Sequence, residues 1–192
     1  ALSLLAIAQA VNKERQSVTV SLVWTGPDSD HIPLRRTEQV LLQLIRAAKE
    51  HLLIVSFAVY KAKIVLSALE EAIYRGVQTV IVLESPDASA GKIGFDPLQS
   101  FEKEILEQAQ FYLWPHDKRP LSPDGKHGSL HAKVAVADEN TLFITSANLT
   151  NYAMNLNMEL GVLIRGGELP KQVEGHFEGM IMKNVISKVQ ES

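Results

Sequence analysis

The sequence predicts an α/β fold in which a mixed β-sheet is sandwiched between α-helices. Helix-like and strand-like patterns alternate along the first 115 residues, which favours a sheet with helices packed on its faces. The segments 51–60 and 77–85 are almost continuously apolar, as expected of strands that are covered on both sides. Further strand-like segments follow Pro115, and the turn 138–140 joins two of them into a hairpin.

The N-terminal part of the chain supplies a peripheral helix, a strand and a core helix. Residues 1–11 are apolar like the centre of a signal peptide, but no basic segment precedes them, and we expect a peripheral amphipathic helix over about 1–16. Val18–Trp24 alternates in the manner of a strand. Thr37 is expected to cap a helix that continues to about Lys49. The apolar face predicted for this helix consists of Val40, Leu41, Leu44, Ile45 and Ala48.

Two more helices are predicted on either side of the strand 77–85. Ile64–Arg75 repeats the helical pattern, and Gly76 is expected to end this helix as its C-terminal cap. A third helix is predicted from apolar residues at a spacing of four, and it leads into the apolar segment 111–115. The residues that mark this helix are Phe101, Ile105 and Ala109.

The character of the chain changes after Pro115. The segment 116–129 is polar and contains two prolines and two glycines, and it is too long for an ordinary connection, so we expect a functional loop. Strands are predicted at 130–137, 141–145 and 158–165.

A last helix is predicted to open at Pro170, because proline is favoured in the first turn of a helix. Its single apolar stripe consists of Val173, Phe177, Ile181, Val185 and Val189. Gly175 and Gly179 lower the helix propensity, and we expect them to allow close packing.

Composition limits the classes of protein to which the chain can belong. With 192 residues and 46% hydrophobic residues, we expect one domain that covers 1–192. The net charge of −3 gives no global positive field, so binding of a polyanion has to rely on a local patch. The chain has no cysteine, which rules out a disulfide framework and favours the cytosol. No apolar run reaches the roughly 18 residues of a membrane span.

The stretch "HAKVAVAD", residues 131–138, carries two basic side chains on an apolar strand. Side chains at positions i and i+2 of a strand project from one face, so His131 and Lys133 are expected to stand side by side. A neutral imidazole is a nucleophile or a proton carrier near pH 7, and an ammonium holds phosphate oxygens. Ser146 and Asn148, again two residues apart, end the neighbouring hairpin strand with further hydrogen-bonding groups. These four residues predict a phosphate pocket that contains a nucleophile.

The same residues resemble a known family. "HAKVAVAD" is similar to the H-x-K-x(4)-D signature of the phospholipase D superfamily at His131, Lys133 and Asp138. "TSANLT" resembles the G-S-x-N segment of that family, with Thr145 where glycine is usual, and "NMELGVLI" resembles its N-x-E segment at Asn157 and Glu159. Within the superfamily, the chain looks like a single-motif member. The segment "LVWTGP" resembles the phospholipase D-like component of bacterial DISARM phage-defence systems.

The resemblance implies a phospholipase D-like fold and phosphodiester hydrolysis or transfer through a covalent phosphohistidine, without metal or other cofactor. His131 would be the nucleophile or, in a partner motif, the acid that protonates the leaving group. Lys133, Ser146 and Asn148 would bind phosphate, while Glu159 would orient the imidazole. The implied catalytic set, in which Asp138 would mainly fix the local structure, is His131, Lys133, Asp138, Ser146, Asn148 and Glu159.

The chain holds one complete signature, whereas the mechanism of the family needs two. A two-fold homodimer would pair His131 with its own copy. Thr145 places a Cβ beside the pocket, which narrows it or impairs turnover. The basic residues Lys118, Arg119 and Lys126 form either a rim that draws in a phosphate backbone or an ordinary solvated loop.

Three functions follow from these expectations. The first is a metal-independent nuclease that acts on DNA or RNA, favoured by the small chain, the single motif and the basic loop. The second applies the same chemistry to a phospholipid as a phospholipase or phosphatidyltransferase. The third is a catalytically weak nucleic-acid-binding or assembly subunit of a larger defence complex, for which Thr145 and the acidic net charge speak.

Overall fold

A nine-stranded mixed sheet forms the centre of the computed structural model, which describes residues 18–28, 31, 34–85 and 97–189. Its strand order is β11-β6-β5-β3-β7-β8-β10-β1-β2. The strands in chain order are β1 Thr19–Thr25, β2 Arg35–Arg36, β3 His51–Ser56, β5 Gln78–Leu83, β6 Gln110–Leu113, β7 Val134–Ala137, β8 Thr141–Thr145, β10 Glu159–Arg165 and β11 Ser187–Lys188. A separate pair is formed by β4 Val59–Tyr60 and β9 Leu149–Thr150.

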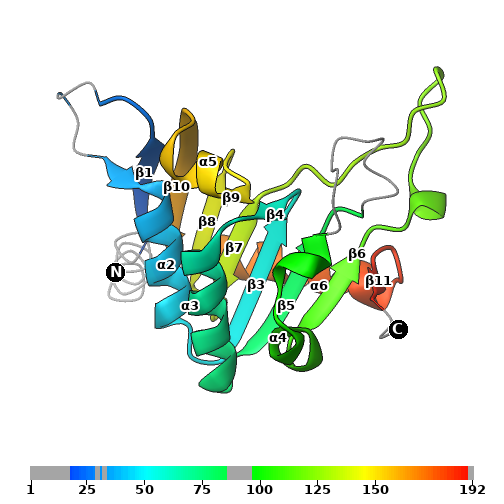
Figure 1. Ribbon diagram of the computed structural model, residues 1–192, viewed down its shortest axis with the longest axis horizontal. Coiled ribbons are helices and arrows are strands. Elements are labelled where there is room, and N and C mark those ends of the chain that lie inside the picture. Colours follow the sequence, from blue (N-terminus) through cyan, green and yellow to red (C-terminus); the bar gives the residue numbers. More distant parts are fainter. Residues whose placement is uncertain (1–17, 29–30, 32–33, 86–96, 190–192) are drawn as a thin grey trace, which may run out of the picture.

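Helices cover both faces of this sheet, as Figure 1 shows. Three of them lie in front of the sheet, namely α2 Thr37–Ala47, α3 Lys63–Tyr74 and α4 Lys103–Gln108, and α6 Leu169–Met182 lies behind it. Shorter turns are η2 Pro97–Ser100, η3 His116–Lys118 and α5 Asn151–Asn155. None of the helices in the described ranges is both long and apolar enough to cross a membrane.

Two apolar cores fill the space on either side. The larger core joins α2, α3 and α4 to the front face, and all five residues of the face predicted for α2 belong to it. The smaller core joins Phe177 of α6 to the back face of β3, β5 and β7. In β7, the side chains therefore alternate between the cores, with Ala135 and Ala137 in front and Val136 behind. The predicted helix–sheet–helix arrangement is confirmed.

The end of α3 follows the sequence prediction closely. Gly76 has φ +87°, and its N–H donates to the Ile73 carbonyl at 2.8 Å, while the Val77 N–H reaches the Ala72 carbonyl at 3.1 Å. These two bonds form a Schellman motif. At the start of α2, in contrast, the prediction of a Thr37 cap is wrong, because Thr37 is the first helical residue and its buried hydroxyl has no hydrogen-bond partner in the described structure.

Three elements are shorter in the structure than the sequence predicted. The strand expected at 51–60 ends at Ser56, whose hydroxyl donates to the Ala58 carbonyl at 2.8 Å where the chain turns into β4. The strand expected from residue 130 begins at Val134. The last helix ends at Met182, so Val185 and Val189 lie beyond it. The helix expected at 1–16 lies outside the described residues.

Glycine serves close packing in β10 rather than in α6. A Cβ added at Gly175 or Gly179 would meet no atom within 4 Å, so the expectation for these two residues is wrong. At Gly161, a Cβ would lie 2.7 Å from Phe143 Cε2 and 2.9 Å from the Ile144 carbonyl oxygen. Gly161 thus allows β10 and β8 to approach each other at the point where Thr145 pairs with it.

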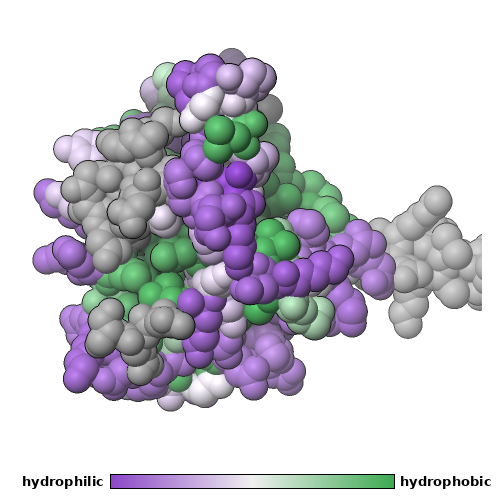
Figure 2. Space-filling model, turned by 90° about the vertical axis from the view of Figure 1, so that its right-hand side faces the viewer, coloured by the Kyte–Doolittle hydropathy of each residue, from purple (hydrophilic) through white to green (hydrophobic). Residues whose placement is uncertain are grey.

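The edge of the sheet at β6 and β11 carries mostly hydrophilic side chains around smaller hydrophobic patches (Figure 2). Lys118 Nζ donates here to the Asn184 carbonyl at 2.5 Å and to Ser187 Oγ at 2.9 Å. These bonds fasten the start of the loop between β6 and β7 to the segment around β11. From there the loop rises above the upper edge of the sheet in Figure 1.

Candidate active site

Apart from Asp138, the residues of the family-like motifs lie at the upper edge of the sheet in Figure 1, where β8 ends and β10 begins. His131 and Lys133 lie in the irregular segment that leads into β7, Ser146 follows β8, and Glu159 is the first residue of β10. The segment 131–133 is held to β8 because the Thr145 N–H donates to the Lys133 carbonyl at 3.1 Å. The Ser146 N–H likewise donates to the Leu160 carbonyl at 3.0 Å, which ties β8 to β10.

His131 and Lys133 stand side by side, as predicted, although they precede the strand. Lys133 Nζ lies 3.2 Å from His131 Nδ1 and donates to the His131 carbonyl at 2.7 Å. The imidazole is exposed, and its ring centroid lies 5.4 Å from that of Phe57. An ammonium has three N–H donors, so one donor of Lys133 remains for a further acceptor.

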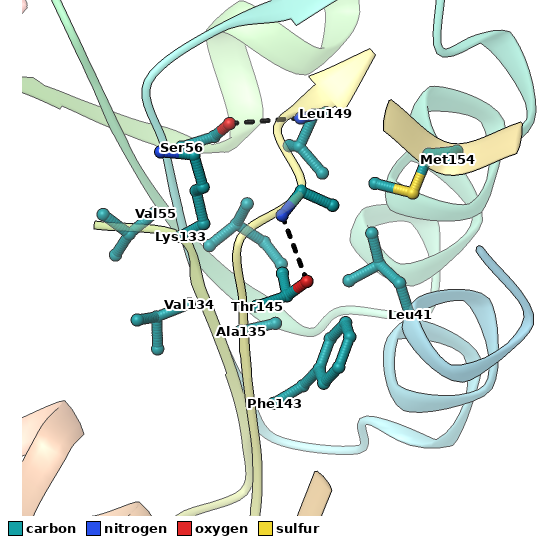
Figure 3. A pocket seen from close by; sticks show the side chains of 12 residues that line it. Leu41, Val55, Ser56, Lys133, Val134, Ala135, Phe143, Thr145, Leu149 and Met154 are labelled. Atoms are coloured by element: carbon teal, nitrogen blue, oxygen red, sulfur yellow. Dashed lines mark hydrogen bonds between the residues drawn. The ribbon is translucent and has the colours of Figure 1, made fainter. Parts of the chain in front are cut away.

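Lys133 is a buried cation at the base of the site. Burial lowers the pKa of its ammonium, and the negative charge of Glu159 partly offsets this effect. Its side chain lines a small cavity of about 10 Å³ together with Leu41, Phe143 and Met154 (Figure 3). A cavity of this size has room for about one water molecule.

Thr145 lines the same cavity (Figure 3). Its hydroxyl accepts a hydrogen bond from the Ala147 N–H at 3.1 Å, which stabilises the turn that carries Ser146. The side chain that Thr145 has and glycine lacks therefore makes a hydrogen bond and packs within the protein. This contact supplies a structural role for the residue at which the chain departs from the G-S-x-N pattern.

Ser146, Asn157 and Glu159 form one hydrogen-bonded group. Ser146 Oγ lies 2.5 Å from Glu159 Oε2 and accepts the Leu160 N–H at 3.1 Å, while Asn157 Nδ2 donates to Glu159 Oε1 at 3.1 Å. Glu159 is thus hydrogen-bonded to Ser146 and Asn157 rather than to His131. Asn148 lies near by on the same turn, and its Oδ1 is buried without a hydrogen-bond partner among the described residues. A buried acceptor of this kind is costly unless a donor reaches it, which fits a site that a ligand or a water completes.

Asp138 belongs to the opposite end of the hairpin. Its carboxylate accepts the N–H groups of His51 at 3.0 Å, Glu50 at 2.9 Å and Lys49 at 3.0 Å. Asp138 therefore lies apart from the other residues of the predicted catalytic set. Its role is structural, as the resemblance to the phospholipase D superfamily implied. Burial of the carboxylate is the largest single influence and raises its pKa, but the three N–H groups and the charge interaction with His51 lower it, and the net effect is a lowered pKa of Asp138.

The predicted basic rim is only partly present. Arg119 is buried and pairs with Glu84, so the expectation that it binds substrate at the surface is wrong. Lys118 is engaged with the segment around β11, and Lys126 Nζ lies 2.9 Å from the Asp124 carboxylate in an exposed pair. Among the described residues, no group of three or more histidine or acidic side chains comes together in a way that would hold a metal ion.

Sequence reasoning missed two neighbours of the site, Glu84 and Phe57. Glu84 accepts the Leu130 N–H at 2.6 Å, one residue before His131. The only signal for it was an acidic residue directly after a strongly apolar strand, where a buried charge requires a partner. Phe57 was hidden within the apolar segment 51–60.

Comparisons with known proteins agree on one kind of domain. The family model described as cardiolipin synthase, PLD-like domain, matches residues 41–181, well over half of the chain. The DISARM protein DrmC of Bacillus paralicheniformis is 27% identical over 97% of this chain and 73% of its own length. Cardiolipin synthase B of Escherichia coli is 23% identical over 88% of this chain, which spans 38% of that protein.

The fold comparison points in the same direction. The crystal structure of a phospholipase D family member, Nuc from Salmonella typhimurium, has a TM-score of 0.66. It covers 91% of this chain and 99% of its own length at 19% identity, which is a similarity of fold. The predicted phospholipase D-like fold is confirmed.

Replacing Asp138 tests its structural role through pH. Because the pKa of Asp138 is lowered in the folded protein, the charged carboxylate contributes stability above its unfolded pKa of about 3.9. That contribution is lost as the pH falls through the folded pKa. Asp138→Asn is expected to lower the free energy of unfolding by about 1–2 kcal/mol at pH 7, since the carboxylate is only partly buried.

The measurement is urea denaturation of both proteins at pH 7 and near pH 3. The two unfolding curves should approach each other at the lower pH. A deficit of the variant that stays the same at both pH values would contradict a role for the charge of Asp138.

Proposed function

The chain belongs to the family of phospholipase D-like domains, and from this premise we propose that it is a metal-independent phosphodiesterase that cleaves nucleic acid. Residues 1–192 are proposed to form one domain, and its nucleophile is His131. The observation that carries the proposal is the pairing of the exposed His131 ring with the buried Lys133 ammonium at 3.2 Å. An imidazole beside a cation with a free N–H is suited to attack a phosphate that the cation holds.

The proposed reaction has two steps. A nitrogen of the His131 ring attacks phosphorus, so that a P–N bond forms and the P–O bond to the leaving nucleoside breaks. The released oxygen takes a proton from the His131 of a second copy. Water then attacks phosphorus and gives its proton to that second histidine, while the P–N bond breaks and frees the first. Lys133 and Asn148 hold the phosphate in both steps, and Ser146 joins them when its hydroxyl turns from Glu159 to a phosphate oxygen.

Nucleic acid is the proposed substrate because the chain is small and carries a single motif, like Nuc from Salmonella typhimurium, 99% of which is covered in the fold comparison. The chain spans most of the DISARM protein DrmC but only 38% of cardiolipin synthase B. The alternative, phosphatidyl transfer, is supported by the match to a family model described by cardiolipin synthase. A catalytically weak subunit of a defence complex is less well supported, since the Thr145 side chain is used in the turn and in the cavity below the site. Recruitment of an active domain into such a complex accords with the similarity to DrmC.

A homodimer is proposed because the reaction needs a second histidine and an apolar sheet face adjoins the site. The strands β8, β10 and β1 form this face. It lies on the α6 side of the sheet, next to the strands on which α6 packs. Ladder pairing places Ile144 opposite Val162, and Val162 opposite Leu22. Its most exposed members are Val20 at 65%, Leu160 at 53%, Leu22 at 49% and Ile144 at 42%. Exposed apolar area of this kind marks a protein interface, and we assign it to the second copy.

Activity in the presence of EDTA tests the nuclease. Labelled DNA, labelled RNA and phospholipid vesicles are incubated with the protein, and cleavage of a nucleic acid is expected. His131→Ala should lower the rate by at least about a thousandfold, because it removes the nucleophile. His176→Ala is the matched control, since His176 is an exposed histidine of α6, and it should cleave like the wild type. Cleavage by the His131→Ala protein, or cleavage of lipid alone, would contradict the proposal.

Sedimentation tests the dimer and its face. Leu160→Glu places a charge on the apolar face and is expected to produce monomers with a rate at least about tenfold below that of the wild type, because the second histidine is lost. Leu121→Glu is the control, as Leu121 is 60% exposed in the loop between β6 and β7 and is not part of this face. A wild-type protein that is fully active as a monomer would rule out the shared site.

A further inference from the structure

The strongest unassigned feature of the described structure is a buried ion pair next to the candidate site. Arg119 Nη2 lies 2.5 Å from Glu84 Oε1, and both side chains are 0% exposed. Glu84 follows β5 directly, whereas Arg119 belongs to the loop that rises between β6 and β7. Two charges are tolerated in such a place only where further hydrogen bonds satisfy both.

Arg119 ties the two ends of the loop together. Its Nε donates to the Trp114 carbonyl at 2.9 Å, and Nη1 donates to the Gly128 carbonyl at 3.0 Å. The guanidinium also lies 4.9 Å from the centroid of the Trp114 ring. The loop between these two carbonyls is therefore closed at its base by one side chain.

Glu84 uses its second oxygen for a different purpose. Oε1 faces Arg119 and accepts the Ser85 N–H at 2.8 Å, while Oε2 accepts the Leu130 N–H at 2.6 Å. Leu130 is the residue directly before His131. One carboxylate thus joins the closed loop to the peptide from which the candidate nucleophile projects.

This bond matters because the backbone around His131 lacks the support of a ladder. The strand β7 begins only at Val134, and the sheet holds the preceding segment at Lys133, through the Thr145 N–H. The His131 carbonyl is held by Lys133 Nζ rather than by a neighbouring strand. The bond from Leu130 to Glu84 is therefore the anchor on the other side of His131.

We propose that Glu84 is a positioning residue for His131, which it acts on through the Leu130 N–H, and that Arg119 balances the buried charge of its carboxylate. This inference rests on the proposed role of His131 as nucleophile. The hydrogen bonds of Glu84 go to Ser85, Arg119 and Leu130, and none of them reaches the His131 ring. A misplacement of about 1 Å in a reacting group lowers a rate about a hundredfold, so an anchor one residue away is sufficient to control turnover.

The test compares two double variants that both remove the ion pair without leaving a lone buried charge. Glu84→Gln with Arg119→Met keeps an acceptor for the Leu130 N–H, whereas Glu84→Leu with Arg119→Met does not. Hydrolysis of bis(p-nitrophenyl) phosphate in EDTA gives kcat and KM. The glutamine double variant should keep kcat within about threefold of the wild type, and the leucine double variant should lose about a hundredfold, with KM changed by less than about threefold.

A second readout does not depend on activity. The ¹H–¹³C NMR signals of the His131 ring, assigned by their loss in His131→Ala, should move in the leucine double variant and stay in place in the glutamine one. Equal kcat values in the two double variants, or His131 signals that coincide in both, would overturn the proposal. A wild type that hydrolyses no phosphodiester refutes the proposed function instead, and the NMR comparison then decides on Glu84 alone.

Glu84→Asp replaces the leucine double variant if that protein does not fold. Aspartate keeps the charge facing Arg119 but draws the acceptor away from Leu130, so kcat should fall about tenfold and the His131 signals should shift. A Glu84→Asp protein with unchanged kcat and unchanged His131 signals would overturn the positioning role.

Discussion

The antiparallel register of β7, β8 and β10 is the constraint on which the candidate site depends. Each of the three sequence segments that resemble the family motifs contributes two polar side chains next to one of these strands, and none of them is complete alone. Pairing of Val134 with Ile144 and of Thr145 with Gly161 brings the three segments to one edge. A slip of one residue would turn every side chain to the other face of the sheet.

Small details of packing enforce this register. Gly161 leaves room for the Phe143 ring, which a Cβ at that position would meet at 2.7 Å. At the far end of the hairpin, the Asp138 carboxylate gathers the N–H groups at the start of β3, so the hairpin is fixed to its neighbouring strand. At the near end, Glu84 takes the Leu130 N–H where the ladder has stopped. The carboxylates of Asp138 and Glu84 thus fix the two ends of the backbone stretch that contains β7 and the segment before it. The candidate catalytic side chains of this stretch, His131 and Lys133, lie between these two anchors.

The sequence was most informative where the interaction partners are close along the chain. His131 and Lys133 are two residues apart, and their contact was predictable even though the strand begins later than expected. The Schellman motif at Gly76 and the apolar face of α2 follow from equally local patterns. Glu84 and Arg119 are 35 residues apart with no pattern between them, so a basic residue in a polar loop was assigned to the surface although it is fully buried. The glycines of α6 show the same limit, because only the neighbours of a glycine decide whether it serves packing.

The central claim is that His131 becomes covalently bound to the phosphate of a nucleic acid. The most direct measurement is single-turnover cleavage of an end-labelled oligonucleotide, stopped with alkali and followed by mass spectrometry of the peptides. We expect a peptide that carries the phosphorylated fragment on His131, formed and lost at rates that match the appearance of product. Product that forms while His131 stays unmodified, or a label on a different residue, would contradict it.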